Sequence, residues 1–181
     1  MDSDTLGTAW HQLEEIQFNE LLRLSRVYYR EANRCHEAKA YLAGCTMSGA
    51  ALEALLLAMV NLYPSDVEAA GHLPNSKGKT KPLLDWSLGA LVEAAARAGW
   101  LPTGLQPGAA WSTSSARVGD YARVVQQLRN LVHPGRYVRD HSPSRVTKKY
   151  LARSLEIIEV ANKYLEARVN ESLRRQLEHE E

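Results

Sequence analysis

Residues 38–63 of this 181-residue chain read AKAYLAGCTMSGAALEALLLAMVNLY, and this stretch decides the fold. Apolar and small residues recur in it at alternating steps of four and three: Ala38, Leu42, Cys45, Gly49, Leu52, Leu56 and Met59. Such steps place side chains on one face of an α-helix, which has about 3.6 residues per turn. The stretch therefore predicts a helix that ends near Pro64. Its small residues, such as Gly44 and Ser48, are expected to let another helix approach closely.

Helical spacing also covers the N-terminal part of the chain. The apolar residues there recur at three- to five-residue steps and form one series: Leu6, Trp10, Leu13, Ile16, Leu21, Leu24 and Val27. Cys35 and Cys45 read as members of a single helix, about 15 Å apart at about 1.5 Å per residue, which is too far for a disulfide. Between residues 64 and 82, breakers and charged residues follow no clear period, so a mobile loop is expected there.

Three more helices are expected in the second half of the chain. They cover residues 82–98, with Gly99 as a C-terminal stop, residues 115–133, and residues from about 144 into the acidic tail. Their expected inward-facing residues are Leu84, Leu88, Leu91 and Ala95; then Val118, Tyr121, Val125, Leu128 and Val132; then Leu151, Leu155, Ile158, Asn162, Leu165, Val169 and Leu173. No alternating strand pattern is present. The sequence thus predicts one all-α domain over residues 1–181, an antiparallel bundle of about five helices with a long C-terminal helix.

Composition and charge narrow the class of protein. The chain has 22 Lys and Arg against 21 Asp and Glu, so no net field draws it onto DNA or a membrane. No run approaches the roughly 20 apolar residues that a membrane-spanning helix needs, and the N-terminus is polar. The chain also lacks a Gly-rich phosphate loop, a nucleophile elbow and a kinase signature. We therefore expect a cytoplasmic protein without membrane contact, in which any affinity for nucleic acid is local.

The stretch most informative for function is residues 127–134, which read QLRNLVHP. Arg129 and His133 are four residues apart at the end of an expected helix, so their side chains project from one face and can meet one phosphate. Histidine exchanges protons near neutral pH, and arginine presents a planar fork of donors to phosphate oxygens. Asn130 points about 100° away from Arg129 and fits a positioning role. The plainer alternative is that Arg129 and His133 only cap the helix C-terminus, an interaction of about 0.3–1 kcal/mol each.

The segment Arg129-Asn130-Leu131-Val132-His133, together with the sequence ALEALL at residues 51–56, resembles the HEPN superfamily of small helical bundles. The resemblance extends over roughly residues 31–165. It implies a metal-independent endoribonuclease that acts as a homodimer, with Arg129, Asn130 and His133 in its catalytic site. Other members of the superfamily only bind RNA or serve as assembly modules. The family usually has four to six residues between the arginine and the histidine, and this chain has three.

A nuclease of this kind needs a group that moves protons and a cation that stabilises the phosphorane formed when the RNA 2′-hydroxyl attacks the adjacent phosphate. His133 is expected to serve as general acid and base, and Arg129 to stabilise the phosphorane. Because one histidine cannot easily be acid and base in the same step, two copies of the motif are expected to meet at a two-fold interface. The resemblance also implies a toxin or antiviral defence effector, with an antitoxin or a defence complex as partner.

Two alternatives to the nuclease remain open. One is a non-catalytic module of the same fold that binds RNA or has a regulatory role, because the shortened spacing has removed the chemistry. Its signature would be RNA affinity that falls with salt, without cleavage. The other is a helical assembly module whose long final helix binds a partner helix or its own copy.

Further RNA contacts are expected downstream of the motif, where charge and one stacking ring line a path: Arg136, Tyr137, Arg139, Lys148 and Lys149. A solvated basic loop is about equally compatible with these residues. Glu53 lies in the middle of the apolar 38–63 stretch, where it either supports Arg129 across the core or sits on an exposed face.

Other polar residues point away from a special site. Lys77, Lys79 and Lys81 read better as a solvated charged loop than as an RNA contact. His36, His72 and His141 lack the spacing of zinc ligands, so neither a metal nor another cofactor is expected.

Overall fold

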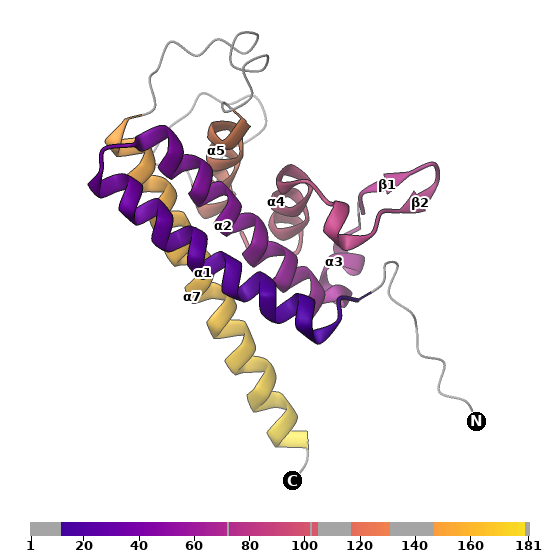
Figure 1. Cartoon of the computed structure of the whole chain (residues 1–181). Helices are drawn as coiled ribbons and strands as arrows, with labels where there is room; N and C mark the ends of the chain where they lie inside the picture. Colours follow the sequence, from indigo (N-terminus) through magenta and orange to yellow (C-terminus); the bar gives the residue numbers. More distant parts are fainter. Residues whose placement is uncertain (1–11, 72, 102, 105–116, 131–146, 180–181) are drawn as a thin grey trace, which may run out of the picture.

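The computed structural model describes residues 12–71, 73–101, 103–104, 117–130 and 147–179. Within these ranges it gives no side-chain description for residues 124, 127–130, 150, 164–165 and 168–179. The described elements are α1 (Glu15–Glu37), α2 (Tyr41–Leu62), α3 (Pro64–Ala70), β1 (Asn75–Ser76), β2 (Lys79–Thr80), the 3₁₀ turn η1 (Leu83–Asp85), α4 (Leu88–Arg97), α5 (Val118–Asn130) and α7 (Lys148–His179). Figure 1 shows these helices gathered into a bundle from which α7 extends at its C-terminal end. The all-α bundle predicted from periodicity is confirmed.

The α1–α2 connection corrects one prediction about the cysteines. Residues 38–40 form a turn in which Lys39 has a left-handed backbone with φ 59°. The Ala40 N–H donates to the Cys35 carbonyl at 2.8 Å, a bond pattern that ends helices at such a residue. Cys35 therefore lies on α1 and Cys45 on α2, not on one helix, and both are free thiols.

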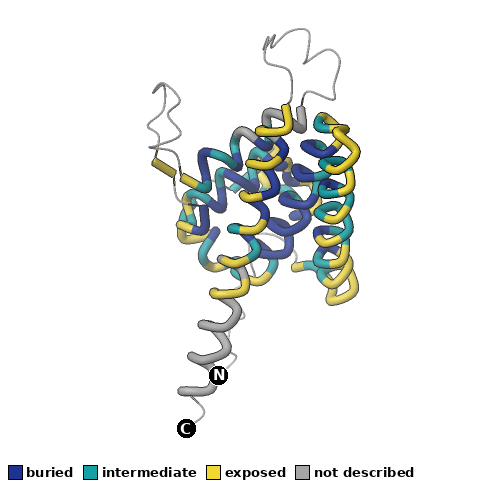
Figure 2. The backbone as a smooth tube through the Cα atoms, turned by 90° about the vertical axis from the view of Figure 1, so that its left-hand side faces the viewer, coloured by how far each residue is buried: buried dark blue, intermediate teal, exposed yellow. Residues whose placement is uncertain are grey.

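Helix α2 forms the centre of the bundle and is buried around most of its circumference (Figure 2). A Cβ atom added at Gly44 would lie 2.4 Å from Leu151 Cδ2 and 3.1 Å from the Cβ of Cys35. Helices α1, α2 and α7 thus meet at Gly44, as its small size predicted. Further along, the Tyr29 hydroxyl donates to Glu159 at 2.6 Å, so α1 and α7 run antiparallel.

The same helix corrects the expectation that no run is long and apolar enough to cross a membrane. Tyr41–Leu62 has 22 residues and a mean hydropathy of 1.6 over its most apolar window. By length and composition alone, this helix could therefore cross a membrane. Of that window, 72% is buried inside the bundle. The apolar residues of α2 therefore pack in the core, where they contact α1, α4, α5 and α7.

Between Pro64 and Ser87 the described residues form regular elements where a mobile loop and the start of a helix were expected. These elements are α3, the antiparallel β1–β2 hairpin and η1. The expected helix at residue 82 begins only at Leu88, where the Ser87 hydroxyl caps it by accepting from the Ala90 N–H at 3.3 Å. As a consequence Leu84, predicted to face inward, is 50% exposed. Ile16, in the first turn of α1, is also exposed.

Most of the remaining inward-facing predictions that fall on described side chains are confirmed. Leu88, Leu91 and Ala95 of α4, Val125 of α5, and Leu151, Leu155 and Ile158 of α7 are buried. Gly99 has φ 75° directly after α4, as its predicted role as a helix stop requires.

The buried thiol of Cys45 makes stability dependent on pH in the alkaline range. Burial raises the pKa of this thiol from 9.0 to about 11, an effect that a hydrogen bond with Ser154 partly opposes. The folded state then holds a proton that the unfolded state loses between those values. The resulting contribution to stability is complete below pH 9 and is lost as pH rises to about 11.

We expect the free energy of unfolding of the wild type to fall more steeply between about pH 9 and 11 than that of Cys45→Ala. Urea unfolding at a series of pH values measures the difference. Tyr29, whose pKa is also raised, mainly by burial, is present in both proteins and so cancels. Equal pH slopes in the two proteins would contradict the expectation.

Candidate functional site

Helix α5 carries the first residues of the predicted motif. Arg129 and Asn130 are its last described residues, and the predicted helix end near His133 lies outside the described residues. Their side chains lie outside the description, as do residues 131–146 with His133, Arg136, Tyr137 and Arg139. The relation between Arg129 and His133 therefore stays a prediction. The structure defines how the helix that carries Arg129 is held.

The start of α5 is held by a buried carboxylate. Asp120 is 3% exposed, and its Oδ2 accepts from the backbone N–H groups of Arg117, at 2.7 Å, and Gly104, at 2.8 Å. The first of these bonds satisfies a donor at the helix N-terminus that has no partner within the helix. The second ties the helix to a segment 16 residues earlier in the chain. Asp120 thus sets where α5 begins.

Gly119 brings the backbone of α5 against the segment that follows α4. A Cβ atom at this position would lie 2.4 Å from the carbonyl oxygen of Leu101 and 2.8 Å from Thr103 Cγ2. No real Cβ lies so close to a backbone oxygen, so only glycine fits the observed arrangement. The first turn of α5 therefore lies against the backbone of Leu101 and the side chain of Thr103.

Contacts with α4 hold the middle of α5 in place. Glu93 of α4 accepts from Arg97 at 2.8 Å on its own helix and from Arg123 of α5 at 3.1 Å. The Arg97 hydrogen bond, with a smaller effect of Arg123, holds the pKa of Glu93 below its usual value. One turn later, Gln126 lies against the backbone at Gly89 of α4. The two helices run antiparallel, with the last turns of α5 beside the start of α4.

Helices α7 and α2 cover two further sides of α5. The guanidinium of Arg153 on α7 lies 5.7 Å from the centre of the Tyr121 ring, a cation–π contact. Ala122 and Val125 are buried in the core that α2 shares. These contacts hold α5 along its described length and so place the backbone of Arg129 and Asn130 in the bundle.

The predicted supporting residues have different surroundings. Glu53 is half-buried on α2, a helix that packs against α5, so the predicted contact with Arg129 is compatible with the helix arrangement and remains a prediction. Lys148 and Lys149 are exposed in the first turn of α7, which contains no acidic residue. Both lysines are thus open to a polyanion.

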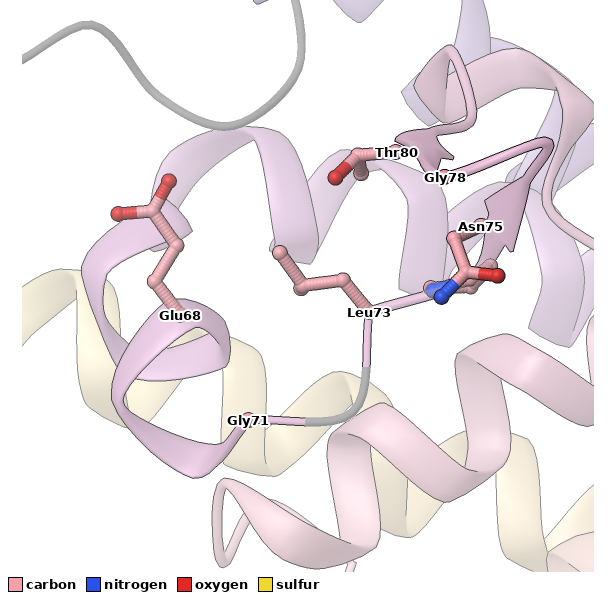
Figure 3. A pocket seen from close by; sticks show the side chains of 7 residues that line it. Glu68, Gly71, Leu73, Asn75, Gly78 and Thr80 are labelled. Atoms are coloured by element: carbon pink, nitrogen blue, oxygen red, sulfur yellow. The ribbon is translucent and has the colours of Figure 1, made fainter.

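A hollow of about 580 Å³ lies between α3 and the β1–β2 hairpin (Figure 3). Leu73 projects into its middle, Glu68 of α3 stands on one side, and Asn75 and Thr80 of the hairpin stand on the other. Of the predicted site residues with described side chains, namely Glu53, Lys148 and Lys149, none lines it. Among the described residues, no group of three His, Cys, Asp or Glu side chains gathers as metal ligands would.

Sequence reasoning missed Asp120, Gly119 and the hairpin. Asp120 is the third residue of α5, a position where an acidic side chain can accept from the N–H of the residue that precedes the helix. Its place in the sequence was therefore a local signal. The contact of Gly119 with Leu101 depends on the tertiary fold and leaves no local pattern.

No family model, curated protein or solved structure matches this chain.

Proposed function

We propose that the chain is a metal-independent endoribonuclease of the HEPN type, with Arg129, Asn130 and His133 as its catalytic residues. The observation that supports this most is that Arg129 and Asn130 lie on helix α5, which packs against the apolar α2 helix that carries the ALEALL sequence. Both sequence elements of the resemblance thus lie on contacting helices of one bundle. An arginine, an asparagine and a histidine are side chains that fit metal-free RNA cleavage.

In the proposed reaction the RNA 2′-hydroxyl attacks the adjacent phosphorus, and the bond to the 5′-oxygen of the next nucleotide breaks. The products are a 2′,3′-cyclic phosphate and a 5′-hydroxyl. His133 removes the proton from the attacking hydroxyl or supplies one to the leaving oxygen. Arg129 donates to the oxygens of the phosphorane, where the charge increases. Asn130 orients the phosphate or the histidine ring.

The proposed active form is a homodimer that cleaves RNA in the cytoplasm. Two motifs in one cleft supply one histidine as base and another as acid, which a single motif does not. RNA leaves this cleft along Arg136, Tyr137 and Arg139 and across the exposed Lys148 and Lys149 of α7. A role as a toxin or defence effector, with a protein that occludes the cleft, fits such an activity.

The test is incubation of the purified full-length protein with labelled total RNA in EDTA. We expect fragmentation that chelation does not stop, because no step uses a metal. Intact RNA, with the protein shown to be folded by circular dichroism, would contradict the proposal. A nuclease contaminant is recognised because its activity persists when His133 is replaced.

A second candidate function is a non-catalytic module, and two observations favour it. Three residues separate Arg129 from His133, fewer than in the active family pattern. Helix α7 has 32 residues against 22 in α2, and Figure 1 shows it passing beyond the bundle, as a helix that binds a partner would. RNA affinity without cleavage would support a binding module. Loss of assembly in a protein with charges at Leu165 or Val169 would support the assembly module.

A further inference from the structure

The segment Asn75–Lys81 forms a rigid projection. Asn75 pairs with Thr80 and Ser76 with Lys79, and the Lys81 N–H donates to the Pro74 carbonyl at 2.9 Å. The carbonyl of Lys81 in turn accepts from the indole N–H of Trp86 at 3.0 Å, and Trp86 is 3% exposed. A buried tryptophan thus anchors the base of the hairpin to the core. Figure 1 shows its tip pointing away from the bundle.

The charge on this hairpin is entirely positive. Its seven residues include Lys77, Lys79 and Lys81 and no acidic residue. Lys77 and Lys79 are exposed, and within the described part of the chain none of the three lysines forms an ion pair. Glu68 is an acidic residue close by, but it lies across the hollow in Figure 3. Asn75 and Thr80 face that hollow, so alternation along the strand places Lys79 and Lys81 on the opposite face.

Lys77, at the tip of the hairpin, has a backbone conformation that is unusual for a lysine. Lys77 has φ 53° and Gly78 has φ 76°, which makes a two-residue loop with both residues left-handed. Asparagine or glycine is the usual first residue of such a loop, because a lysine side chain disfavours this conformation. Lys77 holds this left-handed backbone as Lys39 does, and its side chain places a positive charge at the tip of the hairpin.

The hairpin precedes the start of α4, which packs against the last described turns of α5. Lys81 and Trp86 precede Gly89, and the backbone at Gly89 contacts Gln126, three residues before Arg129. Figure 1 accordingly shows α4 between α5 and the hairpin. RNA bound near Arg129 would reach the three lysines by crossing the start of α4.

We propose that the Lys77, Lys79 and Lys81 hairpin binds the phosphate backbone of the single-stranded RNA that the motif of α5 acts on. This inference rests on the proposed function and adds a binding element for its substrate. The contact is electrostatic and independent of base sequence, since lysine amines bind phosphate as point charges. The hairpin increases affinity and holds the strand; it takes no part in the chemical step.

The test uses the full-length His133→Ala protein, which keeps RNA uncleaved, and fluorescently labelled single-stranded RNA over a series of salt concentrations. In this background Lys77→Asn, Lys79→Gln and Lys81→Gln are introduced together. Lys77→Asn creates the favoured Asn-Gly loop, so the hairpin keeps its turn while losing charge. We expect the Kd at about 0.1 M salt to rise on the order of 10- to 100-fold. The slope of log K against log salt is expected to fall in magnitude by about 2, or roughly 0.7 for each lost contact.

The control carries the same charge change elsewhere: Arg26→Gln, Arg30→Gln and Lys39→Asn. These residues are exposed on α1 and its turn, and Lys39 is also a left-handed lysine. A triple hairpin variant that binds like this control would overturn the proposal. If the triple variant unfolds, the single Lys77→Asn variant should lower the slope by about 0.7. No RNA binding by the parent His133→Ala protein at low salt would instead reject the proposed function itself, and the hairpin inference with it.

Discussion

Replacing His133 with alanine is expected to lower the rate of RNA cleavage on the order of 10²- to 10⁴-fold, because proton transfer to and from the reacting oxygens loses its catalyst. Arg129→Ala is expected to lower it on the order of 10²- to 10³-fold, the usual effect of removing a donor from the charge that develops in the transition state. Both proteins should stay folded. Initial rates with saturating RNA measure the effect on the chemical step.

Matched controls exist on α1, whose last turn contains Arg34 and His36. Arg34→Ala and His36→Ala remove an arginine and a histidine from a helix C-terminus, which is all that Arg129 and His133 would contribute as simple caps. We expect both controls to cleave at close to the wild-type rate. If His133→Ala also retained a rate within about threefold of the wild type, the motif would be a helix cap and not a catalytic site.

Gly119→Ala is expected to destabilise the protein by about 1–3 kcal/mol, the usual range for forcing an extra carbon into close packing. Its Cβ would lie 2.4 Å from the Leu101 carbonyl oxygen, so either α5 or the segment after α4 must move. Either movement disturbs the bonds of Asp120 to Arg117 and Gly104. Because α5 carries the motif, cleavage should fall as well. Urea unfolding and the cleavage rate measure the two effects.

Gly89→Ala is the matched control for this change. Its added Cβ would lie 2.6 Å from Gln126 Nε2, the end of a flexible side chain that can turn away. Alanine also favours a helix over glycine by up to about 1 kcal/mol. We therefore expect Gly89→Ala to be within about 1 kcal/mol of the wild type or more stable. Equal losses in the two variants would show that the Leu101 contact does not fix α5.

The core of this fold could be predicted from the sequence because buried stripes leave a periodic pattern. Leu52 and Leu56 on α2 and Leu151 and Ile158 on α7 were found in this way, and all are buried. The same rule failed at Ile16, which sits in the first turn of α1 where the bundle no longer covers the stripe. Periodicity reports which face is apolar and cannot report where the covering helix stops.

The turns were harder to predict because lysines occupy the places where glycine or asparagine would signal them. Lys39 ends α1 with a left-handed backbone, and Lys77 opens the hairpin loop in the same conformation. Strands of two residues are also too short to show an alternating pattern. As a result one helix was expected across the first turn and a loop in place of the hairpin.

Only part of the candidate site can be predicted from the sequence. The spacing of Arg129 and His133 and the polarity of Asn130 are local features, and the structure places Arg129 and Asn130 on the predicted helix. The groups that hold α5 in place are distant in the chain: Glu93 for Arg123, Arg153 for Tyr121 and Gly104 for Asp120. Such pairs follow from the packing of helices and have no signature in a single sequence.

The most direct measurement of the central claim is the chemical nature of the fragment ends made in EDTA, with DNA of the same sequence as a parallel substrate. The proposed mechanism predicts 2′,3′-cyclic phosphate and 5′-hydroxyl ends from RNA and no cleavage of the DNA, which lacks the attacking hydroxyl. Fragments with 5′-phosphate ends, or cleavage of the DNA, would contradict attack by the 2′-hydroxyl.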